Sequence, residues 1–347
     1  MAITPPPGGG RRIPFGHVPG EGEAELLTLA NASGMRVEIL TLGAAIHAVW
    51  VPDRRGAFAN VTLCYPDLAG YRADTACLGA SIGRVAGRIA GGRFVLDGRL
   101  HQLPRNDGAN SLHGGSHGFH RRLWQVGEAS ASAVTLHLVS RDGDQGFPGT
   151  LSVSARYRLD DAGRLSLTYT ATTDAPTVVG LTNHAYWNLA GDGDSVLGHM
   201  LTILSDAFLP SDAALIPTGE IRAVAGTPFD FRTPTLIGAR ITADDEQLRL
   251  AGGYDHNWLL ARTGQPALAA VLHDPASGRT LRLFTDQPGL QMYSANGLGG
   301  QGFARYAAIT LEPQYWPDTP NRPAFGSARL APGETYRNRI VMEFGVD

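Results

Sequence analysis

A carboxylate that could do acid–base chemistry lies in the stretch ITLEPQYWPDTPN, residues 309–321. The first residues alternate like a strand. Pro313 has no amide donor, so we expect strand pairing to stop there and Glu312 to be held at the strand end. Acceptors beside flat apolar rings suit a sugar, whose hydroxyls need partners and whose C–H faces pack on aromatic surface. The competing interpretation is a solvated surface glutamate. The residues that follow the carboxylate are Gln314, Tyr315 and Trp316.

Two arginines and a histidine stand in glycine-rich stretches. GRVAGRI holds Arg84 and Arg88, and an arginine beside glycine either binds ligand oxygens or clasps loop carbonyls as a structural residue. Its spacing matches no phosphate-binding or dinucleotide-binding pattern. In NSLHGG, His113 precedes two glycines, which often marks a ring beside closely passing backbone.

A second histidine and an aspartate extend this set of polar candidates. His184, in TNHAYWNL, directly follows an apolar strand, so it is either a satisfied core residue or a tuned acid–base group. Asp255, in GGYDHNW, is either a ligand or a turn aspartate that bonds its own backbone.

A metal site is the less favoured use of these histidines. His113, His117 and His120 are close in sequence, but they lie in a glycine-rich loop, and neither HxH, HExxH nor CxxC occurs. We therefore predict acid–base chemistry without a metal or cofactor.

Period-2 alternation dominates the chain and must supply the elements that position these residues. Asp97-Gly98 predicts a tight hairpin turn. Helical periodicity is limited to a turn or two within 67–78 and 243–250. We predict an all-β fold, a large antiparallel β-sandwich, with residues 1–20 as a flexible leader and 21–347 as a single domain. The clearest alternating segments are 35–39, 134–139, 151–159, 165–171, 279–285 and 337–344.

Composition narrows the class of protein. The 347 residues carry a net charge of −3 without a basic stripe, so no nucleic-acid partner is expected. All 29 basic residues are arginine, which excludes a Schiff-base lysine. No apolar run predicts a signal peptide or membrane span. Cys64 and Cys77 form no disulfide framework, which favours the cytoplasm, with the periplasm as the alternative. We expect a monomer or a homodimer.

Taken together, these stretches resemble the aldose 1-epimerase (galactose mutarotase) family. The similarity extends from about Leu40 to Phe344, in the family's order. The resemblance implies a supersandwich fold with the sugar in an open cleft. The segments that carry it are GASIGRVAGRI, NSLHGGSHGFHRRLW, TNHAYWNL, GGYDHNW, LQMYSANG, LEPQYWPDTPN and PGETYRNRIVMEF.

The resemblance also implies a reaction, the interconversion of the α and β anomers of free aldoses such as galactose or glucose. Glu312 would take the proton of the anomeric hydroxyl, and His184 would protonate the ring oxygen so that the ring opens. His113 would help to bind the ring-oxygen side. A negative neighbour should favour the protonated imidazole that this role requires. The residues implied to hold the sugar hydroxyls are Arg88, Asp255 and Gln291.

The chain departs from the family at Gly87, where many members carry asparagine. This change bears on substrate preference rather than on the reaction. Arg84 competes with Arg88 for the sugar-binding role. Two alternative functions are a sugar-binding or sensing protein without turnover, and a glycosidase that uses Glu312 and Asp255 as paired carboxylates.

Overall fold

The computed structural model describes residues 8–191, 194–261, 263–300 and 302–347. The strands of its three large sheets pair in antiparallel fashion, which confirms the predicted all-β class. The Asp97-Gly98 turn joins β8 (Arg93–Leu96) to β9 (Arg99–Gln102) as predicted. Among the described residues, the α-helices are α1 (Leu68–Ala73) and α2 (Glu246–Ala251). The first lies within the expected segment 67–78, and the second overlaps 243–250 and ends one residue later.

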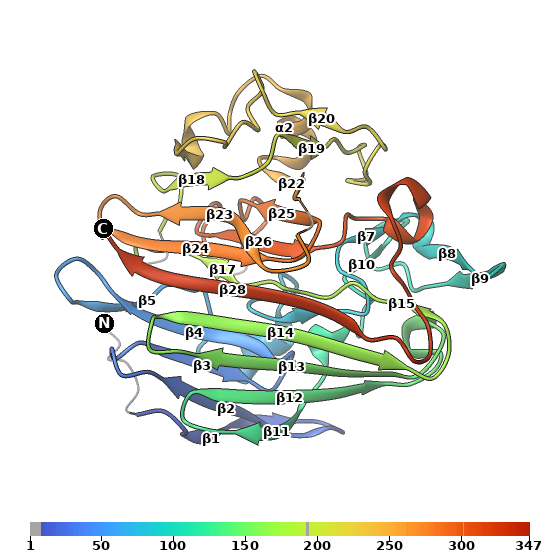
Figure 1. Cartoon of the computed structure of the whole chain (residues 1–347), viewed down its shortest axis with the longest axis horizontal. Coiled ribbons are helices and arrows are strands. Elements are labelled where there is room, and N and C mark those ends of the chain that lie inside the picture. Colours follow the sequence, from blue (N-terminus) through green and yellow to red (C-terminus); the bar gives the residue numbers. More distant parts are fainter. Residues whose placement is uncertain (1–7, 192–193, 262, 301) are drawn as a thin grey trace.

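The largest sheet has nine strands, and β28 lies between β14 and β24 at its centre (Figure 1). Alternation explains its two faces: in β13, Val153, Ala155 and Tyr157 are buried while Ser152 and Arg156 are exposed. In sheet order, the strands are β11 (Gln125–Ala129), β12 (Ala133–Ser140), β13 (Leu151–Leu159), β14 (Arg164–Thr173), β28 (Tyr336–Val346), β24 (Arg279–Thr285), β23 (Ala267–His273), β18 (Met200–Ile203) and β21 (Thr235–Leu236).

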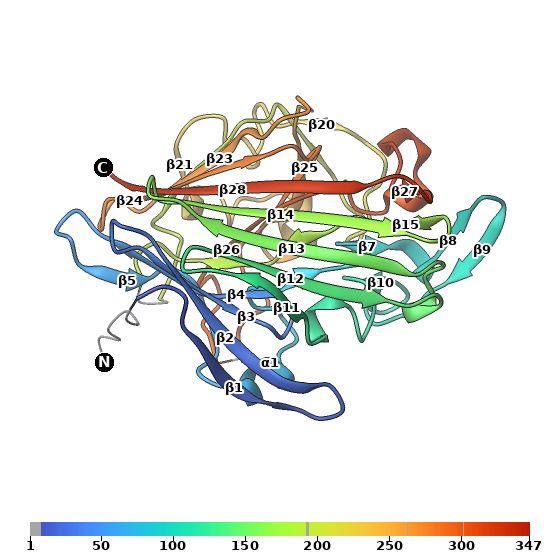
Figure 2. The ribbon, with the colours of Figure 1, turned by 60° about the horizontal axis from the view of Figure 1, so that its bottom comes forward.

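A five-stranded sheet and a six-stranded sheet pack against the buried face of the nine-stranded sheet. Val37, Tyr157 and Met292, one from each sheet, belong to the same hydrophobic cluster, and we infer a single domain from this shared core. Figure 2 shows the five-stranded sheet (blue) near the β11–β13 end of the large sheet. The five strands are β1 (Arg12–Val18), β2 (Gly22–Ala30), β3 (Arg36–Leu40), β4 (Ala45–Pro52) and β5 (Phe58–Asn60). The six, in sheet order, are β17 (Tyr186–Trp187), β26 (Ile309–Gln314), β25 (Gly289–Tyr293), β22 (Asp255–Leu259), β19 (Ala207–Leu209) and β20 (Arg222–Ala223).

Short elements complete the described part of the chain. None of its helices has the length and apolar character needed to cross a bilayer. The two-stranded ladders besides β8–β9 are β7 (Arg88–Ile89) with β10 (Ser111–Leu112), β6 (Ser81–Ile82) with β16 (Thr182–Asn183), and β15 (Thr177–Val178) with β27 (Arg329–Leu330). The 3-10 helices are Ala90–Gly92, Phe119–Arg121, Asp144–Gly146, Ile237–Ala239, Thr319–Asn321 and Pro323–Phe325.

The structure differs from the expected boundary of the leader. Residues 1–7 lie outside the described residues, but Arg12–Val18, inside the predicted leader 1–20, forms β1 and pairs with β2. Ile13 and Phe15 pack against a hydrophobic cluster that includes Leu26 and Leu68. Apolar residues between the glycines and prolines therefore order this segment.

The expectation that strand pairing stops at Pro313 is wrong. β26 continues to Gln314, and Pro313 lies opposite Leu290 of β25. The carbonyl of Pro313 accepts hydrogen bonds from Thr182 and Asn338, so this edge of the residue faces away from β25. Because a strand residue's N–H and C=O share an edge, β25 loses no donor to the proline.

Candidate active site

A cavity of about 400 Å³ opens above one face of the six-stranded sheet. Loops from the β7–β10 and β19–β20 regions complete its walls. Its volume falls in the range of small-molecule sites. The structure brings all six predicted site residues to its lining, namely Arg88, His113, His184, Asp255, Gln291 and Glu312.

Strand register builds the floor of this cavity. Asn257 of β22 lies opposite Gln291 of β25, and Gln291 lies opposite Glu312 of β26. Asp255 shares the cavity face because it is two residues from Asn257. The intervening face, with Trp258 as an example, is buried in the core.

Glu312 is a buried residue, 2% exposed, so the interpretation as a solvated surface glutamate is wrong. Its Oε1 atom accepts a hydrogen bond from the Thr310 hydroxyl at 2.7 Å, and among the described residues Oε2 has no hydrogen-bond partner. Burial raises the pKa of the Glu312 carboxyl to about 8, with the nearby Asp255 carboxylate acting in the same direction and the Thr310 bond opposing it.

His184 stands beside this carboxyl, with its Nε2 atom 3.5 Å from Glu312 Oε1. Its ring packs edge-on against His113 and at an angle to Tyr186. Burial lowers the pKa of His184 to about 4. The expectation of a protonated imidazole is therefore wrong for this structure. Desolvation outweighs the opposing effects of a backbone hydrogen bond and of the Asp74 and Asp255 carboxylates.

His113 presents a defined tautomer to the cavity. The Gly87 N–H donates to His113 Nδ1 at 3.2 Å, so the ring proton of the neutral imidazole is on Nε2. Burial lowers the pKa of His113 well below its ordinary value, with the nearby His184 adding to the effect. A neutral His113 can donate one hydrogen bond from Nε2.

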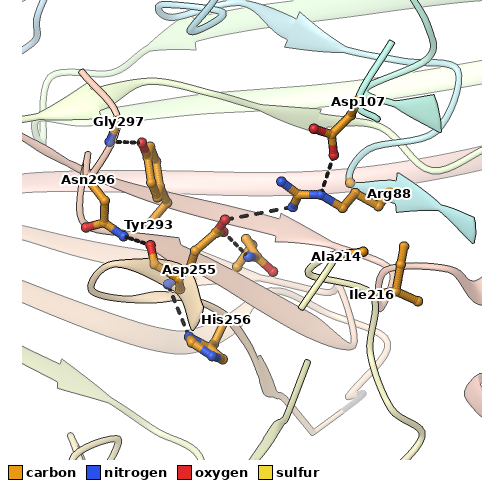
Figure 3. Close-up of polar contacts among 12 residues, drawn as sticks. Arg88, Asp107, Ala214, Ile216, Asp255, His256, Tyr293, Asn296 and Gly297 are labelled. Carbon is orange, nitrogen blue, oxygen red and sulfur yellow. Dashed lines mark hydrogen bonds and ion pairs between the residues drawn. The ribbon is translucent and has the colours of Figure 1, made fainter. Parts of the chain in front are cut away.

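Arg88 is held between two carboxylates (Figure 3). Its Nε donates to Asp107 Oδ2 at 2.7 Å, while Nη1 lies 3.8 Å from Asp255 Oδ2. The other oxygen of Asp255 accepts from Gln291 Nε2 at 2.7 Å. These contacts orient the guanidinium, the carboxylate and the amide at one end of the cavity. The motifs quoted above did not identify Asp107.

The competition between the two arginines is resolved by geometry. Arg84 is buried away from the cavity lining and donates to the carbonyls of Ser140, Arg141 and Pro148. It is the structural arginine that clasps loop carbonyls. Gly87, by contrast, lines the cavity with φ of 74°.

The other histidines are not drawn into a metal site. His117 is exposed and does not line the cavity. Within the described ranges, no three His, Cys, Asp or Glu side chains are grouped to hold a metal ion. His256 is buried among aromatic rings, where its Nδ1 accepts from the Asp255 N–H and its Nε2 faces the Gln247 amide.

Two polar residues of the lining, Asn257 and Gln314, were given no role from the sequence, although Gln314 was noted beside Glu312. Both amide atoms of Asn257 and of Gln314 are buried without a hydrogen-bond partner in the described chain, as is Gln291 Oε1. Burial of such an atom costs free energy unless a hydrogen-bond partner compensates for the lost water. The two-residue period of a β-strand could have identified both residues. Asn257 is two residues from Asp255, and Gln314 is two residues from Glu312, so each shares a sheet face with a predicted site residue. Arg305, also missed, lies on the lining and donates to the Gly252 carbonyl.

Comparison with known proteins gives consistent matches. The family model described as aldose 1-epimerase matches residues 25–343. The chain is 41% identical to a galactose mutarotase of Bos taurus over 344 residues, covering 96% of this chain and 98% of that protein. It is 40% identical to an aldose 1-epimerase of Escherichia coli K12, with coverage of 92% and 94%. Among solved structures, a galactose 1-epimerase from Lactobacillus acidophilus superimposes with a TM-score of 0.85 at 30% identity, covering 97% of this chain and 98% of that one.

Proposed function

The chain belongs to the aldose 1-epimerase family, and we propose that it interconverts the α and β anomers of free aldoses with Glu312 and His184 as its proton-transfer pair. The observation that carries this proposal is their contact, 3.5 Å between Glu312 Oε1 and His184 Nε2, on the lining of one polar cavity. Anomer exchange requires one proton to leave O1 and one to reach O5, so two adjacent groups suffice.

In the opening step, Glu312 accepts the proton of the anomeric hydroxyl and His184 donates a proton to the ring oxygen. The C1–O5 bond breaks with its electron pair on O5, while the O1 lone pair forms the aldehyde. Rotation about C1–C2 exposes the other face of the carbonyl. The reverse transfers then close the ring with either configuration, and neither a redox change nor a second substrate is involved.

The protonation states agree with this cycle. After ring opening, the carboxyl of Glu312 is protonated and the imidazole of His184 is neutral. Burial favours this form in the empty cavity, because it raises the pKa of Glu312 and lowers that of His184. A sugar hydroxyl that donates to Glu312 Oε2 would stabilise the carboxylate and so promote the complementary form.

The remaining lining residues provide binding. We assign Arg88, Asp255 and Gln291 to the sugar hydroxyls, because their mutual contacts orient donors and acceptors at one end of the cavity. We assign His113 Nε2 to the ring-oxygen side, next to the ring of His184. A small sugar is the substrate, and we propose a neutral one. We propose a cytoplasmic location, with which the two free thiols of Cys64 and Cys77 are compatible. We also propose that the protein is a monomer or a homodimer.

The test is NMR of freshly dissolved α-glucose and α-galactose, with and without the protein. We expect the wild-type protein to accelerate anomer exchange of at least one aldose. Glu312→Gln and His184→Asn should each slow this exchange about 10²–10⁴-fold while retaining sugar binding. Near-normal exchange by either variant would refute the assigned role of that residue. Sugar binding by the wild-type protein without accelerated exchange would indicate a sensing protein.

A further inference from the structure

Gln314 has an amide group for which the described structure offers no partner. The residue is 1% exposed, and both Nε2 and Oε1 lack a hydrogen-bond partner among the described residues. A buried amide can form up to four hydrogen bonds, and leaving all of them unmade costs free energy. A partner from outside the chain is therefore expected at this position.

The position of Gln314 points to the substrate as that partner. It lies on the cavity lining, two residues along β26 from Glu312, so its side chain shares the face of the reacting carboxyl. Glu312 Oε2 is likewise buried and unpartnered. The two side chains thus offer a proton acceptor and an uncharged donor–acceptor group on one surface.

Gly87 places no side chain beside this amide. A Cβ atom built on Gly87 would lie 3.5 Å from Gln314 Nε2 and 3.4 Å from Pro317 Cβ, so a side chain there would stand over the amide. Gly87 itself lines the cavity, with φ of 74°, a conformation that favours glycine. The cavity wall next to Gln314 is therefore bare backbone at Gly87, without a side chain that could compete with a ring substituent for the amide.

We propose that Gln314 is a substrate-binding residue that recognises one ring hydroxyl of the aldose, with its N–H₂ donating to the hydroxyl oxygen or its carbonyl accepting the hydroxyl proton. An amide is uncharged and can serve either direction of hydrogen bond, which suits a hydroxyl rather than a carboxylate or phosphate. The proposal rests on the epimerase function proposed above and adds a specificity-determining contact to it.

The test pairs a Gln314→Met variant with a series of singly deoxygenated aldoses. Methionine keeps the length and much of the volume of glutamine but removes the amide. Losing one neutral hydrogen bond should lower kcat/KM for the parent sugar by about threefold to tenfold. For one deoxy position, the penalty seen with the wild-type protein should disappear in Gln314→Met, because the partner of that hydroxyl is already absent.

Controls separate the possible causes. Gln287→Met changes another buried glutamine, which does not line the cavity, and should leave kcat/KM unchanged. If Gln314→Met does not fold, Gln314→Asn keeps an amide but withdraws it by one methylene, and the same deoxy position should lose its penalty. An unchanged kcat/KM, or deoxy penalties identical in wild type and variant at every position, would overturn the role of Gln314. Failure of the wild-type protein to exchange any anomer would instead refute the epimerase function.

Discussion

Glu312 Oε1 and His184 Nε2 lie 3.5 Å apart on the cavity floor, and burial drives both groups toward their uncharged forms. It raises the pKa of Glu312 to about 8 and lowers that of His184 to about 4. Between these values the pair holds a single proton. Whichever of the two groups carries it, one partner can donate and the other can accept, as ring opening and closure require.

We predict a bell-shaped dependence of kcat/KM on pH, with limbs near pH 4 and pH 8. Below the first pKa, His184 gains a proton and the pair has no acceptor. Above the second, Glu312 loses its proton and the pair has no donor. Polarimetry of α-glucose from pH 3 to 10, with the spontaneous rate subtracted, measures this. A plateau that extends to pH 10 would show that Glu312 does not titrate as inferred.

Glu312 should also make folding stability depend on pH. Its folded pKa lies above the ordinary value of 4.5 for a glutamate, so the folded state binds more protons than the unfolded state between about pH 4.5 and 8. Stability from this group is therefore present at low pH and lost as pH rises through 8. Relative to wild type, Glu312→Gln should gain roughly 1–3 kcal/mol between pH 5 and pH 9, measured by urea unfolding. Glu128→Gln, on exposed β11, is the control and should show no such gain.

Removing the charge of Arg84 should mainly lower stability, whereas removing the charge of Arg88 should mainly weaken substrate binding. Arg84→Met leaves the carbonyls of Ser140, Arg141 and Pro148 without their donor and should cost roughly 3 kcal/mol or more of stability, with kcat/KM of the folded protein retained. Arg88→Met should raise KM with a smaller loss of stability. Thermal unfolding and initial rates on both variants distinguish these outcomes, and a high KM for folded Arg84→Met would contradict the assignment.

The charges around Arg88 should select neutral sugars. Asp107 and Asp255 flank this arginine. Arg305 is a further cation on the lining, whereas Arg121 and Arg122 are bound elsewhere, to backbone carbonyls and to Asp144. We expect a higher kcat/KM for glucose than for glucose 6-phosphate. A preference for the phosphate would refute this interpretation.

A change at Asp107 tests the electrostatic origin of that preference. Asp107→Asn removes one negative charge beside Arg88. It should narrow the ratio of the two kcat/KM values by about fivefold at low salt, because two unit charges in water interact by about 1 kcal/mol at a separation of about 4 Å. Asp161→Asn, at a distant exposed turn, should leave the ratio unchanged. An equal ratio in Asp107→Asn and wild type would mean that shape rather than charge excludes the phosphate.

Chelation should not affect the reaction. The proposed cycle consists of two proton transfers and one bond rotation, each supplied by the chain or the sugar. Dialysis against a chelator should therefore leave the rate of anomer exchange unchanged. Loss of activity that a divalent ion restores would contradict the mechanism.

Local patterns were enough to predict the strands, whereas the roles that we propose for Glu312 and His184 came from the family resemblance. The alternation over 151–159 is a property of adjacent residues, and it became β13 because one face of the large sheet is buried. LEPQYWPDTPN and TNHAYWNL marked Glu312 and His184 as candidates, and in both cases a structural alternative stayed open until the family resemblance was considered. Where prediction relied on a single residue's propensity it was less accurate. Pro313 does not end β26, since its missing donor faces away from β25.

The sequence by itself thus determined the all-β class, the strand periodicity and the set of candidate acid–base and sugar-binding residues. Only the tertiary structure decided which arginine faces the cavity, that Asp107 holds Arg88, and that Gln314 has an unpartnered amide there. It also decided the direction in which the pKa of His184 moves. The reason is physical: burial, charge partners and open space depend on residues far apart in the chain, and these are fixed when the sheets pack together.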